Sequence, residues 1–234
     1  MERCALVTGG SSGIGLAVAR MLCAEGYGVT IAGRHADRLS QAAGTLPPNV
    51  HCVVADIARE QDVSAMVRGH TERFGRLDIL VNSAGLFGSD TASSAVTAEV
   101  DARLAVNLRG PLLVTREALP LLRAAGAEHG KALVVNLSSV SGLHGQPRSA
   151  SYSATKAGLI SLTQSLQRET AADGIQATAI CPGLVATAMT AGSAVLAEEM
   201  VQPEDVAETV RFLIRTSRWC LVPEVVLNRR GAIS

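Results

Sequence analysis

The sequence predicts an α/β protein built on a doubly wound parallel sheet of about seven strands, with helices on both faces. Short runs rich in β-branched residues alternate along the chain with longer stretches of helical periodicity. Runs such as Ala132-Leu133-Val134-Val135 are continuously apolar, which is typical of strands covered on both faces. Repeated strand–helix–strand order joins parallel strands through right-handed crossovers.

The alternation places seven strands and six helices along the chain. The strands are expected at residues 3–8, 28–32, 50–55, 78–82, 131–138, 175–181 and 224–227. The helices are expected to begin near Gly13, Ala36, Glu60, Ala98, Ser151 and Pro203. The chain has 234 residues, and one α/β sheet holds a core of that size, so we expect a single domain over residues 1–234.

Composition excludes several classes of protein. Hydrophobic residues make up 47% of the chain, which argues against disorder. The 21 basic and 21 acidic residues cancel, so neither nucleic acid nor an anionic membrane is an expected partner. We find no signal peptide, and no apolar stretch approaches the roughly 20 residues that span a bilayer. The five scattered cysteines indicate reduced thiols in a cytoplasmic protein, and the five histidines lack the spacing of metal ligands.

The first expected strand ends in a glycine-rich turn, Thr8-Gly9-Gly10-Ser11-Ser12-Gly13-Ile14-Gly15, and a helix follows at once. Glycine lets the backbone bend sharply and approach a ligand closely. The free N–H groups and partial positive charge of a helix N-terminus attract a diphosphate. The turn therefore predicts a dinucleotide site, and a plain tight turn is the alternative.

The second expected strand ends in Ile31-Ala32-Gly33-Arg34. In dinucleotide folds, an acidic residue at this point binds the ribose hydroxyls of NAD, whereas an arginine accommodates the 2′-phosphate of NADP. Gly33 leaves the acidic position empty, and the planar guanidinium of Arg34 suits a phosphate. We therefore expect NADP(H) in preference to NAD(H). A solvated charge at a helix start is the alternative for Arg34.

Tyr152 and Lys156 are four residues apart in an expected helix, so their side chains share one face. A nearby ammonium favours the phenolate and lowers the pKa of the phenol, so the pair suits proton transfer at a carbonyl or alcohol oxygen. Nineteen of the 21 basic residues are arginine, and the chain has two lysines and two tyrosines, so this spacing rarely arises by chance. An exposed tyrosine and lysine on a helix surface is the alternative.

The residues Thr8–Gly15, Asn82-Ser83-Ala84-Gly85, Ser139, Tyr152 and Lys156 stand in the order found in the short-chain dehydrogenase/reductase family, which the chain resembles from Arg3 to about Leu227. The resemblance implies a Rossmann fold and an oxidoreductase. Such an enzyme transfers a hydride between NADP(H) and a small ketone, aldehyde or hydroxy acid. The alternative is a protein of the same fold that binds NADP(H) as a sensor, or docks a partner, without turnover.

The resemblance also implies site residues. Four are expected to be catalytic: Ser139, Tyr152, Lys156 and Asn107. The cofactor-binding residues are expected to be Gly9, Ser11, Ser12, Gly13, Ile14, Gly15, Arg34, Asp56, Ile57, Asn82, Ala84, Gly85, Tyr152, Lys156, Pro182, Gly183, Val185 and Thr187. Ser83 stands where the family usually has a second asparagine.

The implied roles divide a proton transfer among the four catalytic residues. Ser139, preferred to Ser138, fixes the substrate oxygen, and Tyr152 exchanges a proton with that oxygen. Lys156 lowers the pKa of the tyrosine and bonds the nicotinamide ribose, and Asn107 holds a water that leads to solvent.

The loops that build the substrate pocket are less informative. Residues 186–202 are expected to form a mobile substrate loop, with an ordinary surface loop as the alternative. His144, Gln146 and Arg148 either reach the substrate or lie at the surface, and Cys181 is expected to serve packing.

The last feature is the end of the chain. Residues 222–229 depart from the glycine-rich ending of many family members and resemble a smaller group that acts on hydroxy acids and other small carbonyl compounds. The family also implies a homodimer or homotetramer through the helices at residues 98–123 and 151–170, although the unusual ending puts the usual C-terminal contact in doubt.

Overall fold

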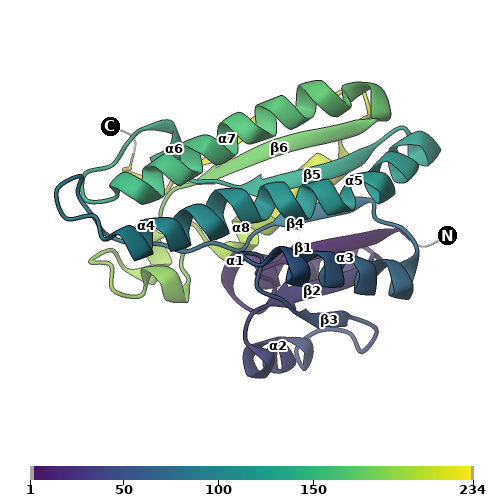
Figure 1. Ribbon diagram of the computed structural model, residues 1–234, viewed down its shortest axis with the longest axis horizontal. Helices are drawn as coiled ribbons and strands as arrows, with labels where there is room; N and C mark the ends of the chain where they lie inside the picture. The colour runs from purple at the N-terminus through teal and green to yellow at the C-terminus, as the bar shows by residue number, and fades with distance from the viewer. Residues whose placement is uncertain (1–2, 233–234) are drawn as a thin grey trace.

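The computed structural model describes residues 3–232, and its centre is one all-parallel sheet of seven strands in the order β3-β2-β1-β4-β5-β6-β7 (Figure 1). The strands are β1 Cys4–Thr8, β2 Gly28–Gly33, β3 His51–Val54, β4 Ile79–Asn82, β5 Ala132–Leu137, β6 Ile175–Pro182 and β7 Glu224–Leu227. Each strand end lies within one residue of its predicted position. The predicted doubly wound sheet is confirmed.

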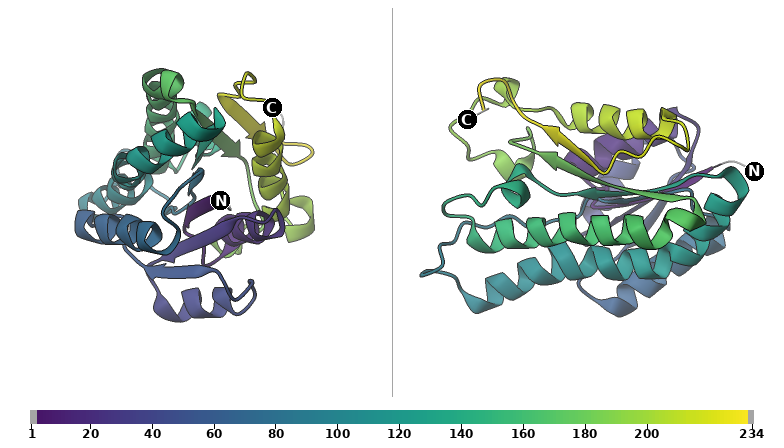
Figure 2. Two further views of the ribbon diagram at one scale, coloured as in Figure 1. Left: turned by 90° about the vertical axis from the view of Figure 1, so that its right-hand side faces the viewer. Right: turned by 90° about the horizontal axis from the view of Figure 1, so that it is seen from above.

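Helices cover both faces of the sheet (Figure 2). One face carries α1 Gly13–Ala24, α2 Ala36–Ala43 and α8 Pro203–Arg215. The other carries α3 Glu60–Phe74, α5 Gly110–His129 and α7 Ala150–Thr170. The smaller helices are α4 Thr97–Leu104, which leads into α5, and α6 Val140–Leu143, which packs against α7.

The central strands contribute side chains to two separate hydrophobic layers, one on each face of the sheet. Along β1, Ala5 and Val7 pack with α1 and α8, whereas Leu6 between them packs with α3 and α5. Successive side chains of a strand point to opposite faces, so a strand covered on both sides needs apolar residues throughout. This explains the continuous apolar runs that predicted the sheet. The edge strand β3 alternates half-buried and exposed residues instead.

The helix predicted over residues 98–123 is interrupted. A π-helical turn, Ala105–Arg109, separates α4 from α5, and the Gly110 N–H donates to the Ala105 carbonyl five residues earlier. Such turns are rare and frequently occur at functional sites. Apolar periodicity over a helix of this length does not reveal one wider turn, so the interruption was not predicted.

The chain crosses over between β3 and β4, since β4 pairs with β1 on the side opposite β2. In open α/β sheets, ligands bind outside the carboxyl ends of the strands at such a switch point. Here the ends of β1 and β4 lie level, because Thr8 pairs with Asn82. The buried Asn82 amide donates to Asn136 Oδ1 of β5 at 2.8 Å, which ties the next strand to the same edge.

Two further observations concern membrane spans and metal sites. In residues 3–232, no helix combines the length and the apolar character that a membrane span requires. Over the same residues, no three His, Cys, Asp or Glu side chains are grouped to hold a metal ion.

Candidate active site

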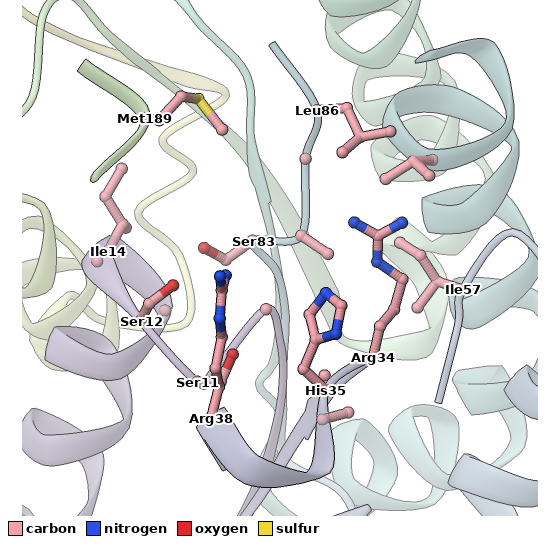
Figure 3. A pocket seen from close by; sticks show the side chains of 18 of the residues that line it. Ser11, Ser12, Ile14, Arg34, His35, Arg38, Ile57, Ser83, Leu86 and Met189 are labelled. Atoms are coloured by element: carbon pink, nitrogen blue, oxygen red, sulfur yellow. The ribbon is translucent and has the colours of Figure 1, made fainter. Parts of the chain in front are cut away.

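A cavity of about 450 Å³ opens at the carboxyl ends of β1, β2 and β4 (Figure 3). Twelve of the residues predicted to bind a cofactor line it: Gly9, Ser11, Ser12, Gly13, Ile14, Gly15, Arg34, Asp56, Ile57, Ala84, Gly85 and Thr187. They come from segments far apart in the sequence, and the fold brings them around one space. The strand ends at the switch point are therefore also the walls of the cavity.

The glycine-rich turn forms the floor of this cavity. Gly9 and Gly13 have φ angles of +68° and +50°, which side chains disfavour, and a Cβ on Gly9 would lie 2.8 Å from Ala84. At the start of α1, the N-cap Ser12 makes no side-chain capping bond, and the first turn has no acidic residue. The first N–H groups of the helix are thus left for an anion, and the turn fits a diphosphate.

Three basic side chains, Arg34, His35 and Arg38, line the β2 side of the cavity (Figure 3). Among residues 3–232, none of the three has an acidic partner within ion-pair distance. Sequence reasoning identified Arg34 and missed His35 and Arg38. The helical spacing of Arg34 and Arg38, with His35 beside them at the helix start, was the signal available.

The remaining predicted cofactor residues lie outside the lining of the cavity. Asn82 is buried in the sheet, and the Gly183 N–H donates to the Leu227 carbonyl at 2.7 Å. Val185 forms an isolated parallel bridge with Val201. Pro182 ends β6. Pro182, Gly183 and Val185 fix the β6 end of the site through main-chain contacts. Tyr152 and Lys156 come from α7, and Lys156 lies next to Gly85 of the lining.

Lys156 is buried, with 5% of its surface exposed, and its Nζ donates to the Leu137 carbonyl at 2.6 Å. A Cβ added to Gly85 would lie 3.7 Å from this Nζ and 3.5 Å from Asn107 Oδ1. The ammonium therefore lies just behind the glycine that lines the cavity. Burial lowers the pKa of Lys156 to about 8, and the Cys181 thiol opposes this shift.

The Tyr152 ring lies between Lys156 and a second aromatic residue. Its centroid is 5.7 Å from Lys156 Nζ, and its plane makes a 73° edge contact with Phe87 at 5.2 Å between centroids. Burial raises the pKa of the Tyr152 phenol above its usual range, and a hydrogen bond with Ser139 opposes the rise. The pKa lowering expected from Lys156 does not outweigh this rise; the Lys156 ammonium donates to the Leu137 carbonyl and lies over the tyrosine ring.

The two adjacent serines at the end of β5 have different partners. The Ser138 hydroxyl donates to the Lys156 carbonyl at 2.9 Å, so it ties β5 to α7. Ser139 is the N-cap of α6, accepts from the Ser141 N–H at 3.1 Å, and lies close enough to the Tyr152 hydroxyl to oppose the rise of its pKa. Ser139 is therefore the serine that shares a site with the tyrosine.

Asn107 lies in the π-helical turn and is completely buried. Its Oδ1 accepts from the Leu86 N–H at 2.7 Å, and its Nδ2 donates to the Leu86 carbonyl at 2.8 Å and to Thr155 Oγ1 at 3.1 Å. The side chain thus holds the segment after β4 against α7. The residue four positions on is Pro111, which has no N–H to offer the Asn107 carbonyl.

The predicted substrate loop, residues 186–202, contains two 3₁₀ turns, Ala188–Thr190 and Ala197–Glu199. Its base is held by the Val185–Val201 bridge, whereas Met189 lines the cavity with half of its surface exposed. A fixed base and an exposed apolar tip suit a substrate loop, and that role stays a prediction.

The segment between α6 and α7 supplies the other predicted substrate contacts. The side chains of His144, Gln146 and Arg148 are exposed. Arg148 has a φ of +62°, the one positive value among the described residues other than glycine. Whether these residues contact a substrate stays a prediction.

Comparison with known proteins identifies one family over most of the chain. A family model described as short chain dehydrogenase matches residues 3–195. A Staphylococcus aureus protein described as an uncharacterized oxidoreductase is 34% identical over 228 residues, which cover 97% of each chain. A Staphylococcus epidermidis relative with the same description is 34% identical over 227 residues, again 97% of each chain.

Solved structures agree over the whole chain. An alcohol dehydrogenase from Thermococcus sibiricus, complexed with 5-hydroxy-NADP, has a TM-score of 0.91 at 26% identity and covers 100% of this chain and 99% of its own. A 3-ketoacyl-(acyl-carrier-protein) reductase from Brucella melitensis, complexed with NADH, has a TM-score of 0.91 at 29% identity, with 99% and 98% covered. The chain is a member of the short-chain dehydrogenase family of oxidoreductases.

Proposed function

We propose that this protein is an NADP(H)-dependent oxidoreductase that interconverts a small carbonyl compound and its alcohol by means of Ser139, Tyr152 and Lys156. The observation that carries the proposal is the placement of the partly buried Tyr152, close to Ser139, and of the buried Lys156 ammonium, which lies over the tyrosine ring and directly behind Gly85 of the cavity lining. The whole of residues 1–234 would then act as one catalytic domain, with residues 186–202 as its substrate loop.

The protein's part in the reaction is to place the substrate and move one proton. Bound at the cavity, the nicotinamide supplies or accepts the hydride. Ser139 holds the substrate oxygen beside the Tyr152 hydroxyl, and Tyr152 donates its proton to that oxygen in reduction or accepts one in oxidation. The buried ammonium of Lys156 stabilises the phenolate that Tyr152 forms during reduction.

The proton lost by Tyr152 during reduction has to be replaced from solvent. The Asn107 side chain is fully engaged with Leu86 and Thr155, so we assign the predicted water to its main-chain carbonyl. Pro111 offers that carbonyl no α-helical hydrogen bond, which suits an acceptor for water.

The preference for NADP(H) is supported by charge. Arg34, His35 and Arg38 offer three basic side chains on the side of the cavity where β2 ends, with no acidic residue paired to them among residues 3–232. A 2′-phosphate adds negative charge at this point, and guanidinium groups bind phosphate through two parallel hydrogen bonds. NAD(H) lacks the phosphate that these groups would bind.

The experiment is NADPH oxidation, with NADH in parallel, against a panel of ketones, aldehydes and keto acids. We expect turnover with at least one member of the panel and preference for NADPH. Tight NADPH binding without turnover on any of them would instead support the alternative function, a sensor on the same fold. No binding of either nucleotide would refute both.

A further inference from the structure

A polar cluster with a buried ion pair lies at the start of α7, and the reaction scheme above does not use it. It consists of Asp90, Arg103 and Ser151; Asp90 and Arg103 are each 4% exposed. Arg103 donates to Asp90 Oδ2 at 2.9 Å and to Ser151 Oγ at 2.6 Å, and Ser151 Oγ donates to Asp90 Oδ2 at 2.6 Å. We call these three residues the Asp90 clamp.

The Asp90 clamp caps the helix that carries the tyrosine. Ser149, the N-cap of α7, makes no side-chain capping bond. Asp90 takes this role from a distant segment, because its Oδ1 accepts from the Ser151 N–H at 3.1 Å and its carbonyl accepts from the Ala150 N–H at 3.2 Å. A carboxylate at a helix N-terminus stabilises the first turn. Tyr152 is the next residue of that turn.

The Asp90 clamp also contacts the segment that carries Phe87 and so positions it. The backbone of Gly88 lies directly on the Arg103 guanidinium, and a Cβ at Gly88 would overlap it. Phe87 is the preceding residue, and its ring makes the edge contact with Tyr152. One guanidinium therefore supports both aromatic rings at this end of the site. Its remaining contact is Glu99 Oε2, 2.7 Å from Nη2.

Stability alone does not explain such a cluster. Removing charges from water costs free energy that a buried ion pair barely recovers, and well-packed apolar side chains of similar volume commonly do as well or better. What an apolar replacement lacks is direction. The fork of an arginine and the two oxygens of an aspartate fix the helix start and the Gly88 backbone relative to each other.

We propose that Arg103 and Asp90 are positioning residues, which hold Tyr152 and Phe87 in the arrangement that the substrate meets. The inference rests on the proposed function of Tyr152. Neither residue touches the cavity lined by the cofactor-binding residues, so the Asp90 clamp acts on proton transfer and substrate placement and leaves cofactor binding alone.

The kinetic test uses Arg103→Met, which keeps an unbranched apolar stem in place of the arginine stem and removes the guanidinium fork. We expect kcat to fall by about 10- to 100-fold, since a displacement near 1 Å has that effect on a reacting group. The Kd for NADPH should stay unchanged, and Arg103→Lys should recover part of the loss. Arg116→Met is the matched control, because Arg116 forms its ion pairs with Glu60 and Glu117 at the surface.

A spectroscopic test needs no substrate. The chain has two tyrosines, so in a Tyr27→Phe background the phenolate absorbance reports Tyr152 alone. Burial raises the pKa of Tyr152, so loosening the first turn of α7 should bring its titration midpoint back toward about 10. We expect this change in Arg103→Met and in Ser151→Ala, and none in Arg116→Met. Ser151→Ala keeps the ion pair, and serves if Arg103→Met fails to fold.

Two results would overturn the proposal. The first is an unchanged kcat and an unchanged Tyr152 titration in folded Arg103→Met or Ser151→Ala. The second is a parallel loss of NADPH binding and kcat, which would make the Asp90 clamp a general support of the fold. If the wild-type protein shows no turnover on any carbonyl, the proposed function fails while the titration still decides the role of the clamp.

Discussion

At the scale of single residues, both lysines of the chain are held by main-chain carbonyls. Lys131 donates to the Leu213 and Thr216 carbonyls at 2.7 and 2.6 Å, which closes the C-terminal end of α8. Lys156 donates to the Leu137 carbonyl in the same way, but it lies beside a tyrosine and a cavity. The scarcity of lysine drew attention to Lys156, and the structure shows that Lys131 caps a helix whereas Lys156 lies at the candidate catalytic site.

The first prediction concerns the proton donor. Tyr152→Phe should abolish NADPH-dependent turnover, because the phenol hydroxyl is the group that exchanges the proton. NADPH binding, measured by fluorescence titration, should be largely retained. Tyr27→Phe provides the matched control, since Tyr27 lies in the hydrophobic core and should leave kcat unchanged. Retained activity in Tyr152→Phe would refute its role.

The second prediction concerns the basic side chains. Arg34→Asp should raise the Kd for NADPH by about 10- to 100-fold, the loss expected for a hydrogen bond between charged groups, with little effect on NADH. Arg38→Ala should act in the same direction more weakly, since it removes one cation without adding an anion. Arg168→Asp changes the charge of an exposed residue in α7 outside the cavity lining and is the control. Equal effects on the two cofactors would remove the case for NADP(H).

At the scale of elements, the strands were predictable because burial on two faces leaves no choice but apolar runs, as at Val134 and Val135. The glycine-rich turn was predictable because the order of strand, glycines and helix along the chain is enough to define it, without contacts from distant segments. The π-helical turn at Asn107 and the Asp90 clamp were not. Each involves hydrogen bonds between distant segments, such as the Leu86 main chain with the Asn107 side chain and Arg103 with Ser151, which sequence periodicity does not record.

A third prediction concerns the packing of α3 on β2 through His70. The ring is fully buried, its Nδ1 is 2.7 Å from the Thr30 hydroxyl, and its Nε2 is 2.8 Å from the Arg76 carbonyl. Burial lowers the pKa of His70 to about 4 from the ordinary value of 6.5, although the bond to Arg76 opposes the shift. The folded protein therefore binds this proton later than the unfolded chain as the pH falls.

The sign follows from that difference. Above about pH 6.5, His70 is neutral in both states and its contribution to the free energy of unfolding is complete. As the pH falls from about 6.5 to about 4, this contribution is lost progressively, by about 3 kcal/mol in all. Urea unfolding at several pH values measures it. His70→Gln should flatten the dependence, and His144→Gln, at an exposed position, should not. The same slope in wild type and His70→Gln would contradict this account.

At the scale of the whole molecule, the cavity joins segments from β1 to the loop after β6, so a bound cofactor contacts much of the chain. Ligands that bind the folded state alone add about 2.7 kcal/mol to its stability at 100 times their Kd. For a protein of this size, that raises Tm by about 5–10 °C. We expect this shift with NADPH in thermal unfolding and a smaller one with NADH at the same concentration. Equal shifts would contradict the preference for NADP(H).

The order of strands in the sheet also dictates an order of assembly. Among the strands, β1 is synthesised first but lies near the middle, and 70 residues separate it from one of its two neighbours, β4. The nascent chain must therefore hold β1 and β2 with one flank open until β4 closes it, whereas β5, β6 and β7 each add to a finished edge. In pulse-labelled hydrogen exchange during refolding, we expect amides of β1 and β4 to become protected together, before those of β7.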